Sequence, residues 1–475
     1  MYREKKYING YLDSKMFDAI YGLAQYFHDA HKELYLVGGC VRDMLLDKKP
    51  HDYDMCTNAT PEEIKEIFRI SVRYTIIETG IKHGTLTIHD RPSNIFFEIT
   101  TFRIDGKYDD NRHPTEVIFT PSLEEDLKRR DFTINSFAYD LHKEELVMLD
   151  KSFLYDLQLG IIRTVGDPAE RYKEDALRML RAIRFASQLN FSLEKDTYLG
   201  ISLCGPLLKN ISKERIRDEL TKILLSDNPQ YLEMIVTTDI ERYLFDNNTP
   251  LTNALNCEHQ NPWHYTDVFH HTIDVVKASP KTFISRWSAL FHDLGKPAVK
   301  ALKPGTTDHY RYIGHPEAST YIADNLMNLL KFSNDQKEII HKFVLYHDYP
   351  LSDVSDKKFK LKLVDIGEEH FLEFLELRKA DGLAHKLNIS SNFAINAVSI
   401  CKDRYMKYLM NPEPMRLKDL AINGDDLKEL GIEGKDIGKT LTYLLSVVLD
   451  NPNKNTRECL MKYARGVKYE NLLHV

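Results

Sequence analysis

The sequence predicts an α+β fold, with a mixed β-sheet in the first third of the chain and helices in the rest. Short apolar runs with strand periodicity alternate with helical patterns up to about residue 150. After Gly166-Asp167-Pro168, apolar residues recur at helical spacing almost to the end, and prolines interrupt the helices. A chain of 475 residues is too long for one hydrophobic core. We therefore expect a sheet-containing head followed by several helical domains.

The composition narrows the class of protein. A net charge of −7 taken alone argues against nucleic-acid binding, but a local basic stripe matters more than the sum. The six cysteines lie far apart without a CxxC pair, which is typical of reduced thiols in the cytoplasm. The polar start MYREKKYING does not resemble a signal peptide, and no apolar run of about 18 residues predicts a membrane span. We therefore predict a cytoplasmic protein.

The head begins with a predicted amphipathic helix over residues 13–30. A second helix is predicted to start at Thr60-Pro61, where a threonine cap precedes a proline and two glutamates. Residues 103–121 are polar and read as a long loop. The predicted strands are Glu33–Val37, Asp52–Cys56, Thr85–His89, Phe96–Phe102 and Leu146–Leu149.

Residues 36–54, LVGGCVRDMLLDKKPHDYD, carry the first candidate site. They read as a strand, a glycine turn, a helix start and a second strand that holds Asp52 and Asp54. Side chains two residues apart on a strand project to the same side, so these carboxylates share a face. At about 4 Å and an effective dielectric near 20, the two charges repel by roughly 4 kcal/mol. We predict a Mg²⁺ site, because this cation takes carboxylate oxygens and substrate phosphates as ligands.

Other residues extend this site. Glu98 in the strand FFEITTFR either joins the acidic pair or faces water from an edge strand, and the residues alone leave both open. Gly38 and Gly39 allow close backbone approach, and Arg42 follows near a helix start. Free backbone N–H groups, a helix N-terminus and an arginine together suit a triphosphate. The stretch therefore predicts a metal-dependent nucleotidyl transfer centre.

Residues 174–184, EDALRMLRAIR, form a second pattern, read as one continuous helix. Asp175, Arg178, Arg181 and Arg184 recur every third residue and span about 13 Å along that helix. Aspartate only accepts hydrogen bonds and arginine only donates them. Cytosine and adenine present an amino donor beside a ring-nitrogen acceptor, whereas uracil and guanine present the reverse. Asp175 with Arg178 can therefore select C and A without a nucleic-acid template, unless this is a salt-bridged surface helix.

These motifs resemble a known family. LVGGCVRDMLL followed by DYD resembles the signature of the class II nucleotidyltransferases, which comprise tRNA CCA-adding enzymes and bacterial poly(A) polymerases. EDALRMLRAIRF resembles the nucleotide-recognition motif of that family. The loop 103–121 looks like the flexible loop that CCA-adding enzymes use in switching from C to A addition. The resemblance implies Mg²⁺ as cofactor and tRNA, CTP and ATP as partners.

The segment DLKRRDFTIN, residues 126–135, is a further family motif. From the residues, one guanidinium of Arg129 and Arg130 can pair with Asp131 while the other faces a phosphate. The resemblance implies that Arg130 contacts the incoming nucleotide, with Asp131 and Asn135 shaping the site. A surface salt bridge is the alternative.

A separate candidate metal site lies within residues 260–381. Histidines beside an HD pair, followed by a late aspartate, suit a divalent cation, although scattered histidines also occur in ordinary cores. HHTIDVV followed by FHDLGKP looks like an HD domain, and the resemblance implies His271, His292, Asp293 and Asp381 as ligands. Some HD modules hydrolyse cyclic phosphate ends or nucleotides, and others have no shown activity.

Two basic or glycine-marked regions are candidates for RNA contact. The helix at residues 212–225 carries basic residues that either touch a tRNA acceptor stem or form a solvated face. Residues 417–444 contain two glycine-marked turns, and they are similar to the C-terminal tRNA-binding tail of Gram-positive-type CCA-adding enzymes. Simple helical packing is the alternative for the tail.

We predict a nucleotidyltransferase head at 1–155, a helical neck and body at 156–250, an HD domain at 251–385 and a tRNA-binding tail at 386–475. The predicted function is template-independent addition of C, C and A to tRNA 3′ ends from CTP and ATP. A poly(A) polymerase or A-only enzyme, and an HD phosphohydrolase with an RNA-binding front half, are the alternatives. The sequence leaves the oligomeric state open.

Overall fold

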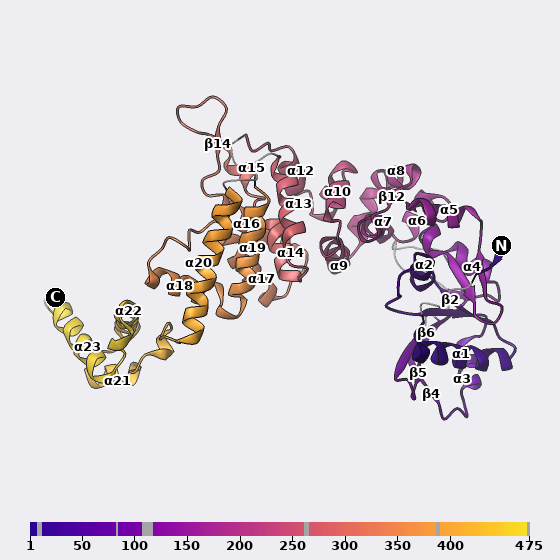
Figure 1. The fold of residues 1–475 in the computed structure, drawn as a ribbon, viewed down its shortest axis with the longest axis horizontal. Helices are drawn as coiled ribbons and strands as arrows, with labels where there is room; N and C mark the ends of the chain where they lie inside the picture. The colour runs from indigo at the N-terminus through magenta and orange to yellow at the C-terminus, as the bar shows by residue number, and fades with distance from the viewer. Residues whose placement is uncertain (7–11, 82–83, 107–116, 261–265, 386–389, 473–475) are drawn as a thin grey trace. The chain divides into compact units, whose positions relative to one another are not determined.

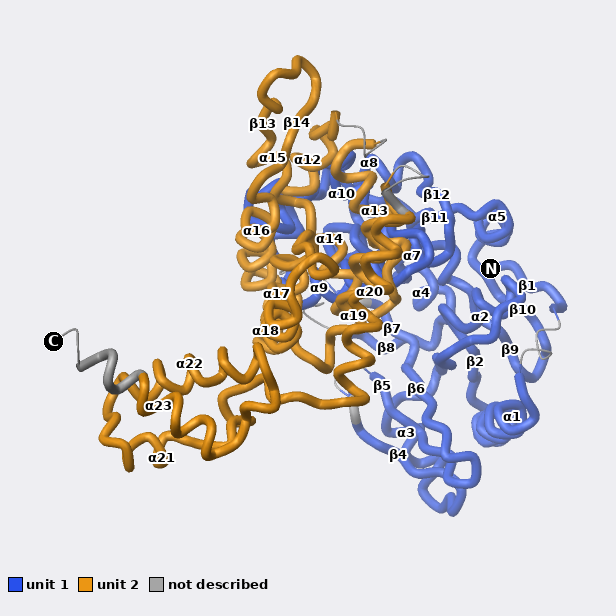
Figure 2. The backbone as a smooth tube through the Cα atoms, turned by 60° about the vertical axis from the view of Figure 1, so that its left-hand side comes forward, with its two compact units in different colours: residues 1–249 blue, residues 250–475 orange. Residues whose placement is uncertain are grey.

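The computed structural model describes residues 1–6, 12–81, 84–106, 117–260, 266–385 and 390–472. The chain divides into two compact units, residues 1–249 and residues 250–475 (Figure 2). The first unit contains an eight-stranded sheet and its surrounding helices, and the second is almost entirely helical (Figure 1). The predicted α+β class, with a mixed sheet at the front, is confirmed. The finer division into four domains remains a prediction.

The sheet of the first unit has the strand order β1-β10-β9-β2-β3-β6-β5-β4. β3 and β6 pair in parallel, and the other neighbours in this sheet are antiparallel. The strands are β1 Tyr2–Lys5, β2 Leu34–Val37, β3 Asp54–Thr57, β4 Tyr74–Gly80, β5 Thr85–Asp90, β6 Ile95–Thr101, β9 Phe137–Asp140 and β10 Glu145–Met148.

The centre of this sheet is apolar because β2 is buried along its whole length. Tyr35, Val37 and Phe102 belong to one core cluster with residues of the neighbouring strands and helices. The cluster fixes the carboxyl end of β2, and the glycine turn follows directly. The head helices are α1 Ser14–Asp29, α2 Gly39–Leu45, α3 Pro61–Ile67 and α4 Leu123–Lys128.

Several element predictions are confirmed and others need correction. α1 is capped by Asp13, and α3 begins with the predicted capping box between Thr60 and Glu63. The strand expected from Asp52 begins only at Asp54. The loop expected over 103–121 has strands at its ends, where β7 Arg103–Asp105 pairs with β8 Val117–Phe119. The middle of that predicted loop, 107–116, lies outside the described residues.

The helix expected over residues 174–184 is in fact two helices. α6 Pro168–Glu174 ends at Asp175, whose backbone is extended with φ −137° and ψ 104°, and α7 begins at Leu177. The side chain of Asp175 accepts a hydrogen bond from the N–H of Leu177 at 3.0 Å. Aspartate commonly accepts from the backbone N–H two residues later in a turn. The remaining elements of the unit are α5 Ser152–Leu159, α7 Leu177–Leu189, α8 Lys195–Cys204, α9 Lys213–Leu224, α10 Glu233–Thr237, α11 Glu241–Leu244, β11 Ile161–Ile162 and β12 Ser192–Leu193.

The second unit is built on packed helices. α13 packs against α14 and α19, and α17 packs against α14 and α16 (Figure 1). Searched over the described residues, no helix is both long and apolar enough to cross a bilayer. The elements are α12 Pro250–Leu255, α13 Val268–Ala278, α14 Phe283–Phe291, α15 Lys296–Val299, β13 Ala301–Leu302, β14 Tyr310–Arg311, α16 His315–Leu329, α17 Asn334–Tyr346, α18 Asp356–Ile366, α19 Phe371–Leu383, α20 Ser390–Met410, α21 Gly424–Glu429, α22 Lys435–Asp450 and α23 Arg457–Leu472.

Candidate functional sites

A cavity of about 610 Å³ in the first unit brings together most of the predicted site residues. It lies where the carboxyl end of β2, the start of β3 and the middle of β6 meet α7 and α9. Its charged and amide lining residues are Arg42, Asp54, Glu98, Arg103, Arg129, Arg130, Asp131, Asn135, Asp175, Arg178, Arg181 and Arg215. The acidic residues of the sheet and the predicted base-reading residues therefore face one space.

Asp54 and Glu98 are direct register partners across the parallel pair β3 and β6. Desolvation and then the charge of Glu98 raise the pKa of Asp54, although Arg130 opposes this shift. A carboxyl whose pKa is raised by a neighbouring carboxylate gains from a bound cation, so the two oxygen donors suit Mg²⁺. Asp52 also raises the pKa of Asp54, but it precedes the strand and is not part of the cavity lining.

The backbone of the turn at Gly38 lies close to the side chain of Arg130. Gly38 has φ +74°, and a Cβ at this position would lie 3.2 Å from Nη1 of Arg130. Arg42 donates from Nη1 to Oδ1 of Asn135 at 2.7 Å, and from Nε to Asp43. α2 has only seven residues, so most of the positive charge here comes from the arginines rather than from the helix N-terminus.

The expected pairing within the Arg-Arg-Asp motif is wrong. Arg129 and Arg130 both donate to the fully buried Asp126, at 2.6 Å and 3.2 Å. Asp131 instead accepts from Nε and Nη2 of Arg181, at 2.9 Å and 2.5 Å. The apolar pattern of α4 is the signal that could have placed Asp126 on the buried side of that helix. Asp126 thus holds both arginines at the cavity wall.

The predicted base-reading residues also have unexpected partners. Arg178 donates to Glu174, and to the backbone oxygens of Arg171 and Arg129. Asp175 accepts from Arg215 of α9 at 3.2 Å, a pairing that the basic pattern of residues 212–225 did not identify.

Arg184 does not line the cavity. It donates to Glu219 at 3.1 Å, and its guanidinium lies 4.2 Å from the centre of the Phe185 ring. Its expected place on one stripe with Asp175 is wrong, because Asp175 has extended backbone after α6 whereas Arg184 lies on α7, so the two residues do not share one helix.

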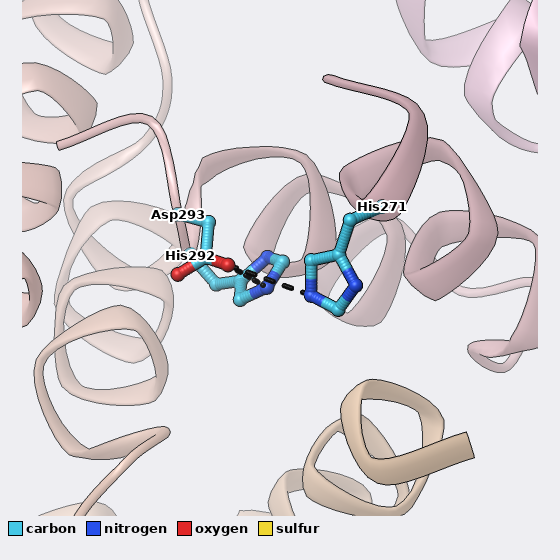
Figure 3. A group of neighbouring side chains, drawn as sticks. All are labelled: His271, His292 and Asp293. Carbon is cyan, nitrogen blue, oxygen red and sulfur yellow. Dashed lines mark ion pairs between the residues drawn. The ribbon is translucent and has the colours of Figure 1, made fainter. Parts of the chain in front are cut away.

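The second unit brings together all four predicted HD residues. His271 lies on α13, while His292 and Asp293 follow α14, and their side chains point toward one another (Figure 3). Nε2 of His271 lies 3.1 Å from Oδ1 of Asp381, and Nε2 of His292 lies 3.2 Å from Oδ2 of Asp293. His271, His292 and Asp293 are buried. The ligand atoms of His271, His292 and Asp293 form one compact donor set for a divalent cation, and Asp381 belongs to a second set with His271 and His385.

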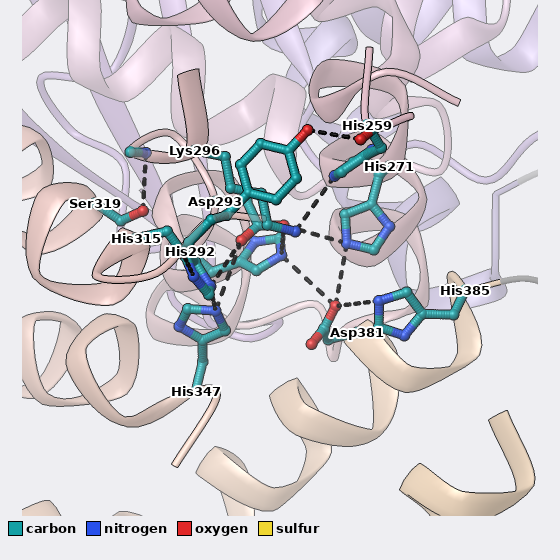
Figure 4. A network of polar contacts seen from close by, with 12 residues as sticks. His259, His271, His292, Asp293, Lys296, His315, Ser319, His347, Asp381 and His385 are labelled. Carbon is teal, nitrogen blue, oxygen red and sulfur yellow. Dashed lines mark hydrogen bonds and ion pairs between the residues drawn. The ribbon is translucent and has the colours of Figure 1, made fainter. Parts of the chain in front are cut away.

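Three further histidines, His315, His347 and His385, belong to the same cluster (Figure 4). His315 and His347 approach Oδ1 of Asp293 to 3.5 and 3.7 Å through Nε2. Sequence reasoning did not assign them as ligands, although His315 and His347 fall within the candidate region 260–381, in Gly314-His315-Pro316 and Tyr346-His347.

The backbone orients three of these rings. Nδ1 of His292, His315 and His347 lies 2.7–2.8 Å from a backbone carbonyl oxygen three residues earlier. Such a carbonyl accepts a hydrogen bond from Nδ1–H, which keeps the proton on Nδ1 and leaves the Nε2 lone pair facing inward, as in metal-ligating histidines. Lys296 also contacts Asp293, at 2.5 Å.

A cavity of about 880 Å³ opens on this cluster. Its walls include Lys303, Arg311, Tyr310 and Tyr312, together with Asp293. Basic and aromatic side chains beside a donor set for cations suit a phosphate-bearing ligand.

Both the fold and the first cavity define a nucleotidyltransferase, and comparison with known proteins agrees. The family model described as poly A polymerase head domain matches residues 34–163. The models described as RNA and SrmB-binding site of polymerase A and tRNA nucleotidyltransferase domain 2 match residues 190–254 and 317–464. The chain belongs to the CCA-adding enzyme family, because it is 37% identical to the CCA-adding enzyme of Limosilactobacillus reuteri over 338 residues.

The extent of these matches differs between relatives. The L. reuteri match covers 68% of this chain and 81% of the relative. The chain is 51% identical to the CCA-adding enzyme of Lactobacillus helveticus over 199 residues, 42% of this chain, but spans only about half (48%) of that relative. The crystal structure of the Bacillus stearothermophilus CCA-adding enzyme with CTP has the same fold, with a TM-score of 0.71 and 24% identity, covering 98% of this chain and 100% of that one.

Proposed function

We propose that this protein adds C, C and A to the 3′ ends of tRNA, using CTP and ATP and releasing pyrophosphate. The observation that carries the proposal is that Asp54 and Glu98 share one cavity with Asp175 and Arg178. The names of related proteins support it, since solved CCA-adding enzymes of this fold bind CTP, ATP and tRNA. The six free cysteines and the tRNA substrate support a cytoplasmic location.

The acidic residues fit a divalent cation. Asp54 and Glu98, with Asp52 close behind, would hold Mg²⁺, since burial and then the charge of Glu98 raise the pKa of Asp54 and a bound cation offsets both effects. When bound, the ion lowers the pKa of an attacking hydroxyl and neutralises phosphate charge.

The arginines of the cavity would bind the triphosphate. Arg42 and Arg130 flank the Gly38 turn, which lets the backbone approach the phosphates closely. Arg181, held by Asp131, extends this positive wall. The 3′-OH of the RNA then attacks the α-phosphate in line, and pyrophosphate leaves toward the arginines.

Base selection would use Asp175. Its carboxylate only accepts hydrogen bonds, so the exocyclic amino group of C or A fits, whereas the carbonyl of U or G leaves buried groups unpaired. The same cavity would thus choose the nucleotide and align its α-phosphate.

A tRNA lacking CCA, incubated with CTP, ATP or both, tests the proposal. We expect C incorporation from CTP alone and completion of the end with both nucleotides. Asp54→Asn should abolish incorporation, whereas Asp18→Asn on α1, which does not line the cavity, should not. Uptake of ATP alone onto this RNA, with no uptake of CTP, contradicts CCA addition and identifies a poly(A) polymerase or an A-only enzyme.

The histidine–aspartate cluster supports a second candidate activity. We propose that His271, His292, Asp293 and Asp381 hold a divalent cation of the HD type and that the site hydrolyses phosphate esters. The inward-facing Nε2 atoms and the basic cavity wall support this proposal. A nucleoside 2′,3′-cyclic phosphate offered with a divalent cation tests it. Hydrolysis should be lost in His292→Ala and kept in His341→Ala, and equal rates in both variants contradict it.

A further inference from the structure

The cavity of the first unit contains an arginine to which neither the sequence motifs nor the comparisons give a role. Arg215 lies in the first turn of α9 and donates from Nη2 to Oδ2 of Asp175 at 3.2 Å. It lines the same cavity as Asp175 and Arg178. Arg215 therefore belongs to the polar surroundings of the carboxylate that the proposed function assigns to base reading.

The packing of α9 on α7 fixes the position of Arg215. Glu219 lies one helical turn after Arg215, and residues four apart share a helix face. Glu219 accepts from Arg184 of α7 at 3.1 Å, and both side chains are buried. This buried ion pair anchors the face of α9 that presents Arg215, so Arg215 is held toward Asp175.

Hydrogen-bonding capacity distinguishes Arg215 from its neighbour Arg178. Both terminal nitrogens of Arg178 already donate, to Glu174 and to two backbone carbonyls. Nη1 of Arg215 is buried and has no hydrogen-bond partner among the described residues. A buried unpaired donor is costly, and a ligand acceptor in the cavity would relieve that cost.

We propose that Arg215 is a nucleotide-contacting residue that reads the base together with Asp175. Nη2 holds Asp175 in the orientation that accepts the amino group of the base. Nη1 donates to the second acceptor on the same base edge, beyond the ring nitrogen. Cytosine presents two acceptors beside its amino group, the ring nitrogen and the carbonyl oxygen. Adenine presents only a ring nitrogen followed by a C–H. Arg215 therefore favours CTP over ATP, a refinement that rests on the proposed function.

Nucleotide binding and incorporation by Arg215→Met test this inference. Loss of one hydrogen bond from a charged donor should weaken CTP binding and kcat/KM for CTP by about 10- to 100-fold. ATP binding should also weaken, because Asp175 loses the partner that orients it, but by about 10-fold less than CTP binding, because the adenine edge lacks the second acceptor. The readouts are titration calorimetry with each nucleotide and single-nucleotide addition to tRNA.

Two further variants keep the test decisive. Arg217→Met on the same helix is the control, since Arg217 pairs with the adjacent Asp218 and does not line the cavity. Arg215→Lys keeps the charge but loses the planar fork, so the CTP-to-ATP ratio should still fall, even if Arg215→Met does not fold. An equal loss for both nucleotides, or an unchanged ratio, overturns the inference. A parent protein that incorporates neither C nor A contradicts the proposed function instead.

Discussion

Asp131 and Arg181 are joined by two hydrogen bonds, because Nε and Nη2 of Arg181 both donate to Oδ2 of Asp131. The pair connects the segment after α4 to α7, and it lies in the wall of the cavity of the first unit. Burial alone would raise the pKa of Asp131, but Arg181 outweighs it and lowers the pKa to about 2.

The lowered pKa of Asp131 predicts an acid-sensitive contribution to stability. In the unfolded chain this carboxyl titrates near its ordinary value of 3.8. The folded state therefore gains stability above that pH and loses it as pH falls toward 2, by about 2 kcal/mol in total. Asp131→Asn should flatten the fall in the free energy of unfolding between pH 4 and pH 2, measured by urea titration. A variant whose acid limb matches that of the parent protein would show that Asp131 is not the titrating group.

Glu98 is predicted to act with Asp54 rather than as a solvated edge glutamate. Glu98→Gln replaces a carboxylate ligand with a neutral amide. The Mg²⁺ concentration for half-maximal incorporation should therefore rise about 10- to 100-fold. Glu78→Gln on β4, where Glu78 pairs with Lys65, is the matched control and should leave that concentration unchanged. Equal Mg²⁺ dependence of the two variants assigns Glu98 to the surface.

Chelation should destabilise the second unit if its histidine cluster binds a cation. A ligand present at 100 times its dissociation constant stabilises the folded state by about 2.7 kcal/mol. We expect the parent protein to lose thermal stability in a chelator, and His347→Gln to lose bound metal, measured by mass spectrometry of the purified protein.

His341→Gln is the control for that experiment. His341 lies on α17, the helix that ends directly before His347. It pairs with Asp324 at the surface instead of joining the cluster. A parent protein whose unfolding temperature is the same with and without chelator argues against a cation in the cluster.

Gly295 allows α15 and α16 to approach closely beside the cluster. A Cβ at this position would lie 2.3 Å from the backbone nitrogen of Ser319 and 2.6 Å from the carbonyl carbon of Ala318. Gly295→Ala should therefore lower the free energy of unfolding by about 1–3 kcal/mol, because the backbone must shift. Gly438→Ala, in α22 where no atom lies within 4 Å of the added methyl, should raise it by up to about 1 kcal/mol. Denaturant titration measures both.

The sequence predicted the elements that depend on local signals. The start of α3 follows from a capping box, and the strand that ends before Gly38 follows from an apolar run and a glycine turn. Asp54 and Asp175 line one cavity, which agrees with the family resemblance that assigns both of their motifs to one nucleotidyltransferase.

What sequence reasoning missed were contacts between distant segments. Helical periodicity gave no sign of the extended backbone at Asp175, since a single residue interrupts the pattern. Arg181 pairs with Asp131, which lies 50 residues away in the sequence, and Arg215 pairs with Asp175, which lies 40 residues away. Charge pairing of this kind depends on tertiary packing, and many arginines and acids in the sequence are equally suitable partners.

Most arginines that line the cavity of the first unit form ion pairs with acids of the protein. Ion pairs join Arg129 and Arg130 to Asp126, Arg178 to Glu174, Arg181 to Asp131, and Arg215 to Asp175. Long side chains held in this way lose little further rotamer entropy when a triphosphate arrives. The cavity is therefore preorganised. Neutralising one of these acids would release its arginine side chain, which the ligand must then order on binding.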